Sequence, residues 1–291
     1  MVKVAVFPAL FILIAIVACA TVESGESEVT VSATEVKEPP QEEGADAASA
    51  SEVSEPAIVR TFRIAKTRLF LANGVFDSFI VIKYQEGLLM AENEFYADGT
   101  PSGAVVYIYD GSNIVETQKR AADGSYLSGH AFKYGEAGSL ERDILLDSQK
   151  EPILTSTYEY DVEGRKIRWA ISDRNSVVLG YAEYLYDSGR NVRVENYSAS
   201  GVLQEFMDRT FDPQGYPTKE LITASDGKEI ERVELDYDGG HLSTKTLYLQ
   251  TRKIGSTEYR YDDDDNLIKE IRYGRTGDAV ESFEYEYEEV Q

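Results

Sequence analysis

The chain has little cysteine, histidine or positive charge. Its 291 residues include one Cys, two His and one Trp, and 29 Lys and Arg stand against 52 Asp and Glu, for a net charge of −23. A single Cys excludes an internal disulfide and a Cys-based zinc site. Two His leave little for a His-rich metal site or a catalytic dyad. Because the phosphate backbone requires a basic surface, we expect no nucleic-acid partner.

The amino terminus has the pattern of an export signal. Lys3 gives a short basic start, and residues 4–17 are almost unbroken apolar sequence. A run of ~14 residues is too short to span a ~30 Å hydrocarbon core, but it has the length of a signal-peptide core. The run ends in IVAC, which places the only cysteine, Cys19, directly after it.

The IVAC tetrapeptide is similar to the lipobox of bacterial lipoproteins. The resemblance implies a signal peptide at residues 1–18, cleavage between Ala18 and Cys19, a diacylglycerol on the Cys19 thiol and an acylated amino terminus. Several acyl chains, each worth ~0.8 kcal/mol per buried CH₂, anchor a protein stably where one chain is marginal. The alternatives are an ordinary signal peptide with a chance Cys and an uncleaved anchor.

Residues 19–57 are predicted to be an acidic tether behind the lipidated Cys. Residues 20–56 contain ten acids and one base and lack aromatic side chains, for a net charge of −9. Such a segment buries too little apolar surface to offset its ordering entropy, so we expect it to be disordered and extended. A spacer that holds the folded part off an anionic membrane and a linker with no task beyond its length both fit.

A repeat of about 25 residues fills the rest of the chain. Nine aromatic anchors recur at separations of 24 to 26 residues. Many have a second aromatic residue two positions earlier, and this spacing puts both rings on one face of a strand. Such regularity is typical of a repeat architecture. The anchors are Tyr84, Tyr109, Tyr134, Tyr160, Tyr186, Phe211, Tyr237, Tyr261 and Tyr287.

Turn residues divide each repeat into two strands. Asp follows most anchors and Gly comes shortly after it, as in YDVEG at residues 160–164, and a second turn such as Asp98-Gly99 falls in mid-repeat. Asp can hydrogen-bond the turn backbone, and Gly accepts φ > 0. Each repeat is therefore predicted to be one β-hairpin, and the whole an all-β antiparallel meander of about 18 strands.

The two ends of the array differ from its middle. Residues 58–83 fit the repeat poorly, and Asn73-Gly74 predicts a turn there, which we interpret as an atypical N-terminal capping hairpin. At the other end the sequence YEYEE at residues 285–289 is acidic, and like charges are expected to discourage edge-to-edge pairing.

Residues 84–291 resemble the YD repeats of RHS-type bacterial proteins. The match rests on TYEYDVEGRKI, AEYLYDSGRNV and DRTFDPQGYPT and covers about 70% of the chain, with a longer period than is usual in that family. The resemblance implies a curved or spiralling β-sheet and says little about function.

The shape of the sheet stays open at this level. Twist should curl about 18 strands into a superhelical trough, a solenoid-like spiral or an incomplete barrel. A transmembrane barrel is a rival, because alternation and aromatic rows fit it loosely. Against it, charged residues lie next to most anchors and the even spacing leaves no long loops.

Nothing in the sequence forms a recognisable catalytic set. His130 and His241 lie in different repeats, and a lone His in a polar strand is usually a surface residue. The chain contains no G-x-S-x-G, Walker or H-E-x-x-H motif. We therefore predict no enzymatic activity and no cofactor.

The densest acidic run is a weak candidate for Ca²⁺, which prefers hard oxygen ligands. It lacks the Gly and the distal Glu of an EF-hand loop, and it falls where the other repeats place a solvated turn. The run is Asp262, Asp263, Asp264 and Asp265.

The tyrosine rows are the best candidate surface. One interpretation is a binding face for a protein or a glycan, because tyrosines present flat amphipathic area. The other is the core of the repeat, with each ring worth ~1.5–3 kcal/mol on burial. The strict periodicity favours the core, since recognition residues tend to vary between repeats.

Together these features predict a lipoprotein of the bacterial cell envelope, held to a membrane by lipid on Cys19. Its β-repeat ectodomain is predicted to be a non-catalytic binding or scaffolding module for an unknown protein or glycan. The alternatives are an envelope or outer-membrane assembly factor and, with less support, an envelope enzyme or inhibitor. The sequence does not decide which membrane or which side.

The lipid anchor gives the first testable prediction. Cys19→Ser removes the acyl acceptor, so cells that express this variant should incorporate no radiolabelled palmitate into the protein, and the protein should accumulate as a precursor or in soluble form. Palmitate uptake equal to that of the unmodified chain would refute the assignment.

Overall fold

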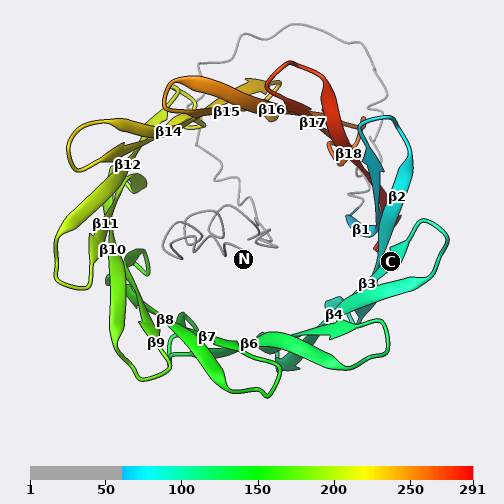
Figure 1. The fold of residues 1–291 in the computed structure, drawn as a ribbon, viewed down its shortest axis with the longest axis horizontal. Helices are drawn as coiled ribbons and strands as arrows, with labels where there is room; N and C mark the ends of the chain where they lie inside the picture. The colour runs from blue at the N-terminus through cyan, green and yellow to red at the C-terminus, as the bar shows by residue number, and fades with distance from the viewer. Residues whose placement is uncertain (1–60, 291) are drawn as a thin grey trace, which may run out of the picture. The chain divides into compact units, whose positions relative to one another are not determined.

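Residues 61–290, the part described by the computed structural model, form a closed barrel of 18 antiparallel strands (Figure 1). Consecutive strands pair with each other, and β1 also pairs with β18. The predicted all-β meander and its strand count are confirmed, and the shape is a closed barrel. The strands are β1 (Phe62–Leu71), β2 (Phe76–Gln85), β3 (Leu88–Tyr96), β4 (Pro101–Asp110), β5 (Asn113–Ala121), β6 (Tyr126–Tyr134), β7 (Leu140–Leu146), β8 (Pro152–Tyr160), β9 (Lys166–Asp173), β10 (Val178–Asp187), β11 (Arg190–Ser198), β12 (Leu203–Phe211), β13 (Pro217–Ala224), β14 (Glu229–Asp238), β15 (His241–Leu249), β16 (Arg252–Tyr261), β17 (Leu267–Gly274) and β18 (Ala279–Glu289).

The export and anchoring features predicted from the sequence fall elsewhere in the chain. The signal peptide at 1–18, Cys19 and the tether to residue 57 lie outside the described residues. Within residues 61–290, no helix has the length and apolar character needed to cross a membrane.

Asp and Gly shape the hairpin turns as the sequence predicted. In the β9–β10 turn, Asp173 Oδ1 accepts hydrogen bonds from the backbone N–H groups of Asn175 and Val177, both at 2.9 Å. The bond from Val177 holds the pKa of Asp173 below its usual value. In the β3–β4 turn, Gly99 takes a φ of 83°, a conformation that side chains with a Cβ rarely adopt. Local sequence therefore determines where each strand reverses.

The side chains of the barrel divide into two faces. The registers place the nine anchors on one of them, which we call the tyrosine face. On β8, Glu159 is exposed whereas Tyr158 and Tyr160 on either side of it are half-buried, and on β10 Glu183 is exposed beside half-buried Tyr184. Because side chains crowd together on the concave side of a closed sheet, we assign the tyrosine face to the inner wall of the barrel.

Few side chains are fully buried in this single layer of sheet. Among the described residues, the buried apolar side chains are Leu146, Ile171, Ala182 and Val233. A molecule without a thick apolar core depends on its ladder hydrogen bonds and on side-chain pairs between neighbouring strands, each worth ~0.2–1 kcal/mol.

The ring closes between the first and last strands. The β1–β18 ladder runs from Phe62 opposite Glu289 to Leu71 opposite Glu281. At the seam, Arg63 Nε lies 2.7 Å from Glu288 Oε1. Opposite charges therefore meet across the seam, and a second ion pair joins Arg68 to Glu286.

Both predictions about the ends of the array require correction. The hairpin predicted within residues 58–83 is present as β1–β2, but it does not cap an open array, because β1 pairs with β18 on its other side. The acidic β18 is likewise not an edge strand. Its carboxylates would repel an identical edge, but they attract the basic side chains of β1, and this complementarity favours closure.

Candidate binding face

Six of the nine anchors donate a hydrogen bond from the tyrosine hydroxyl to a backbone carbonyl on the strand directly before their own. The distances between the hydroxyl and carbonyl oxygens are 2.8–3.0 Å. We call these bonds the tyrosine links. The donor–acceptor pairs are Tyr109–Leu89, Tyr134–Ile114, Tyr160–Leu140, Tyr186–Lys166, Tyr261–Leu242 and Tyr287–Leu267.

Each acceptor in a tyrosine link stands opposite the anchor of the hairpin before it. Leu89 faces Tyr84 in the β2–β3 ladder, and Lys166 faces Tyr160 in the β8–β9 ladder. One anchor therefore reaches the residue that is paired with the previous anchor, and each link bridges two neighbouring strands on the inner wall. A neutral hydrogen bond contributes ~0.5–1.5 kcal/mol to stability, so a single link stabilises the barrel only modestly and the repeated links stabilise it together.

Phe211 has no hydroxyl, and Arg209 makes the hydrogen bonds to the equivalent acceptor position instead. The acceptor position is Asn191, which stands opposite Tyr186 in the β10–β11 ladder. Arg209 Nη1 lies 3.0 Å from Asn191 Oδ1 and 3.4 Å from the Asn191 carbonyl oxygen. The same guanidinium donates from Nε to Glu220 Oε1 at 2.8 Å, which fixes its orientation.

The remaining two anchors make ring contacts. The guanidinium of Arg63 lies 4.1 Å from the ring centroid of Tyr84, beside the β1–β18 seam. The rings of Tyr237 and Tyr216 are stacked with centroids 5.0 Å apart. All nine anchors thus hold a defined position on the wall.

A second row of side chains lies two residues before the anchors on the same wall. Tyr107 donates its hydroxyl to Glu92 Oε1 at 2.7 Å. Burial raises the pKa of Tyr158 and of Tyr259 to about 12. These phenols are therefore protonated at neutral pH and can donate hydrogen bonds.

The inner wall gathers aromatic rings and a cation on β6–β10. Lys166 Nζ lies 4.4 Å from the ring centroid of Tyr184 and 5.7 Å from that of Tyr158. Burial lowers the pKa of Lys166. Trp169, the only tryptophan of the chain, stands opposite Tyr158 in the β8–β9 ladder. We call this set the aromatic–cation cluster; it consists of His130, Phe132, Asp143, Tyr158, Lys166, Trp169 and Tyr184.

His130 is part of this wall and is not an isolated surface residue. Its Nδ1 lies 2.6 Å from Asp143 Oδ1, and its ring is stacked on Phe132 with centroids 6.0 Å apart. The hydrogen bond to Asp143 raises the pKa of His130. The pair can therefore offer a proton donor on the ring nitrogen that faces away from Asp143.

The acidic run proposed for Ca²⁺ is occupied by turn contacts. Asp262 Oδ1 accepts the backbone N–H groups of Asp264 at 3.0 Å and Asn266 at 2.8 Å. Asp265 Oδ1 lies 3.0 Å from His241 Nε2. Across residues 61–290, no group of three or more His, Cys, Asp or Glu side chains is placed to hold a metal ion.

Sequence reasoning found the anchors but missed Lys166 and Arg209. The signal for Arg209 was present: it replaces the second aromatic residue in the one repeat whose anchor is Phe211. Lys166 could not be separated from other strand lysines, because its role depends on rings contributed by two neighbouring strands.

Comparison with known proteins gives no family. No protein-family model and no curated protein matches the chain. Similar solved structures include the Tc holotoxin pore of Photorhabdus luminescens (12% identity, TM-score 0.35), of which the chain spans only 13% while 77% of this chain is covered. A porin-like protein of Bacteroides uniformis is 9% identical with a TM-score of 0.42, the alignment covering 77% of this chain and 98% of that one. Because the identities and TM-scores are this low, these neighbours assign no function.

The tyrosine links predict a specific loss of stability. Tyr160→Phe keeps the ring and removes the donor to the Leu140 carbonyl, so it should lower the free energy of unfolding by ~0.5–1.5 kcal/mol. Tyr160→Ala should cost ~3–5 kcal/mol. Urea unfolding measures both. Tyr96→Phe, at an exposed position, is the control; if it costs as much as Tyr160→Phe, the links do not stabilise the barrel.

Proposed function

We propose that the chain is a lipid-anchored protein of the bacterial cell envelope whose barrel binds a ligand on its inner wall without transforming it. The observation that carries the proposal is the aromatic–cation cluster. Its rings offer flat surfaces and its Lys166 and His130 offer hydrogen-bond donors, while the tyrosine links hold the surrounding strands in place. A rigid wall of this kind spends little entropy on ordering itself when a ligand binds.

The chemistry of the cluster favours a glycan that carries carboxylates. Sugar rings pack on Tyr and Trp faces, which are amphipathic, and Lys166 and His130 can pair with negative groups. The barrel itself is acidic, so binding would need these local cations. Envelope polysaccharides that contain acidic substituents combine both features.

An assembly factor could recruit another chain either by pairing with a free strand edge or through a face of the sheet, and the first of these has no support in residues 61–290. Within the described residues every strand from β1 to β18 has a partner on both sides. Recruitment of another chain by pairing with a free strand edge therefore has no support here, and recruitment through a face is what remains of that alternative.

A fluorescence titration tests the proposal, because Trp169 is the only tryptophan and lies in the cluster. With soluble peptidoglycan fragments as the probe, we expect a saturable change in tryptophan emission. Lys166→Gln should weaken the affinity about tenfold or more, equivalent to ~1.4 kcal/mol.

Lys245→Gln provides the matched control. Lys245 lies on the same tyrosine face, on β15, away from the cluster. Its replacement should leave the affinity unchanged. A titration that shows no saturable change, or equal losses from the two lysine variants, would contradict the assignment of the ligand to this cluster.

A further inference from the structure

The barrel has two rims of different construction. The anchor rim carries the turns that follow the anchors, together with both ends of the described chain, where the Val290 N–H donates to the Thr61 carbonyl at 2.8 Å. The mid-repeat rim carries the tips of the other hairpins, from β1–β2 to β17–β18. Figure 1 shows these tips projecting outward from the ring. Neither end of the described segment, residues 61–290, lies at the mid-repeat rim.

Exposed apolar side chains occur at both rims of residues 61–290, and the mid-repeat rim has more of them. The β9–β10 tip presents three in a row, with exposed fractions of 57% for Val177 and 44% for both Val178 and Leu179, and the next tip presents Val202 at 58%. Such side chains in water are typical of interaction surfaces. The exposed apolar residues at this rim are Leu71, Val75, Tyr96, Leu127, Val177, Val178, Leu179, Val202, Leu249, Ile254 and Val280.

The two rims also differ in the balance of acidic and basic residues. The connecting segments of the anchor rim carry nine acids and one base, whereas those of the mid-repeat rim carry six acids and four bases. Two anchor rims repel each other. Two mid-repeat rims repel each other less, because their acids and bases are more nearly balanced and some pair within a tip, as Asp226 does with Lys228.

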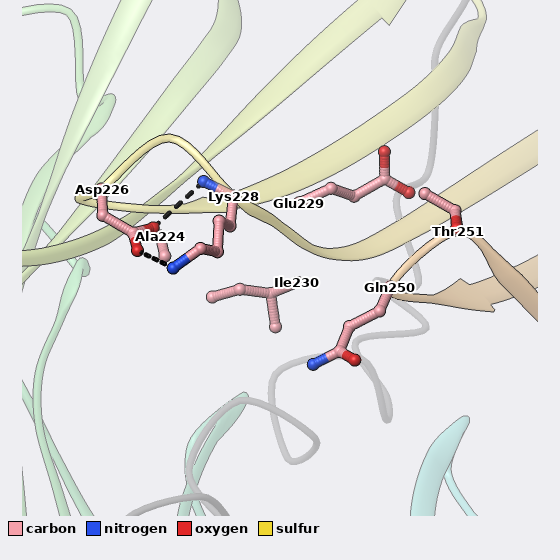
Figure 2. Close-up of a pocket in the computed structure, with 7 residues that line it drawn as sticks. All are labelled: Ala224, Asp226, Lys228, Glu229, Ile230, Gln250 and Thr251. Carbon is pink, nitrogen blue, oxygen red and sulfur yellow. Dashed lines mark hydrogen bonds and ion pairs between the residues drawn. The ribbon is translucent and has the colours of Figure 1, made fainter.

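A recess of about 550 Å³ lies at the mid-repeat rim, between the tips of β13–β14 and β15–β16. Figure 2 shows Ile230 between Lys228 of the first tip and Gln250 of the second. Ala224 and Ile230 give the recess an apolar lining that can receive an aliphatic side chain.

We propose that two copies of this chain associate through their mid-repeat rims, with the β9–β10 tip of each copy seated in the recess between the β13–β14 and β15–β16 tips of the other. A two-fold axis perpendicular to the barrel axis makes the interface self-complementary: when the β9–β10 tip of one copy enters the recess beside β15–β16 of the other, the reverse contact forms as well. Val177, Val178 and Leu179 are then removed from water, and the acidic anchor rims stay far apart.

Sedimentation velocity of the full chain in a density-matched detergent tests this proposal, over concentrations up to about 100 μM. The unmodified chain should show a reversible monomer–dimer equilibrium. Val177→Glu combined with Val202→Glu should weaken dimerisation at least tenfold, because the interface would bury unpaired carboxylates.

A control variant adds the same charge to the other rim. Val162→Glu combined with Val290→Glu alters the anchor rim, where these side chains are 98% and 39% exposed. This variant should dimerise as the unmodified chain does. A chain that remains monomeric at every concentration, or a control that loses the dimer to the same extent, would overturn the proposal.

Discussion

Closure of the sheet is the constraint on which the rest of the structure depends. A single layer of 18 strands has no second layer against which to pack, and its buried apolar side chains are few. When β1 meets β18, every strand of residues 61–290 gains a partner on each side, and this part of the chain has no free edge to pair with another chain. Closure also creates a concave wall, on which the anchors line up and six of them donate to the neighbouring strand.

The tyrosine links turn this geometry into a rigid surface. Each linking hydroxyl satisfies a backbone carbonyl of the preceding strand, so the two strands of a repeat are tied together at their far ends. The links leave the second row of side chains facing the interior from fixed strands. Under the proposed function, recognition and architecture are divided between adjacent rows: the anchors hold the wall, and the row that includes Tyr158 and Tyr184 offers rings to a ligand.

Much of the fold could be predicted from the sequence, because the repeat encodes it locally. The Asp and Gly turns set the hairpins, and the spacing of two between aromatic residues sets their common face. Closure could not be read in this way, since it depends on twist accumulated over all the strands. A signal existed nonetheless: Arg63, Lys66 and Arg68 on β1 match the alternating Glu284, Glu286 and Glu288 on β18. Taken alone, the glutamates of β18 suggest an edge strand that like charges protect from pairing. Taken together with the basic residues of β1, they indicate that the two strands pair.

The residues of the candidate site also fall into two groups, those that the sequence reveals locally and those that it does not. The anchors were visible because they recur, whereas Lys166 and Arg209 act through side chains from other strands. Arg209 shows how a repeat tolerates the loss of a hydroxyl at Phe211: a longer side chain two residues earlier reaches the same acceptor. The calcium hypothesis arose because an acidic run that shapes a turn has the composition of a ligand set.

Formation of a disulfide across the seam tests closure most directly. Leu71 and Glu281 stand opposite each other in the β1–β18 ladder although 210 positions separate them in the chain, and opposed residues of an antiparallel pair are close enough for a disulfide. In a chain that also carries Cys19→Ser, Leu71→Cys with Glu281→Cys should oxidise to an intramolecular disulfide. A pair made from Leu71→Cys and Gln204→Cys on β12 should keep both thiols free. If the seam pair instead stays reduced, or links only separate molecules, the sheet does not close.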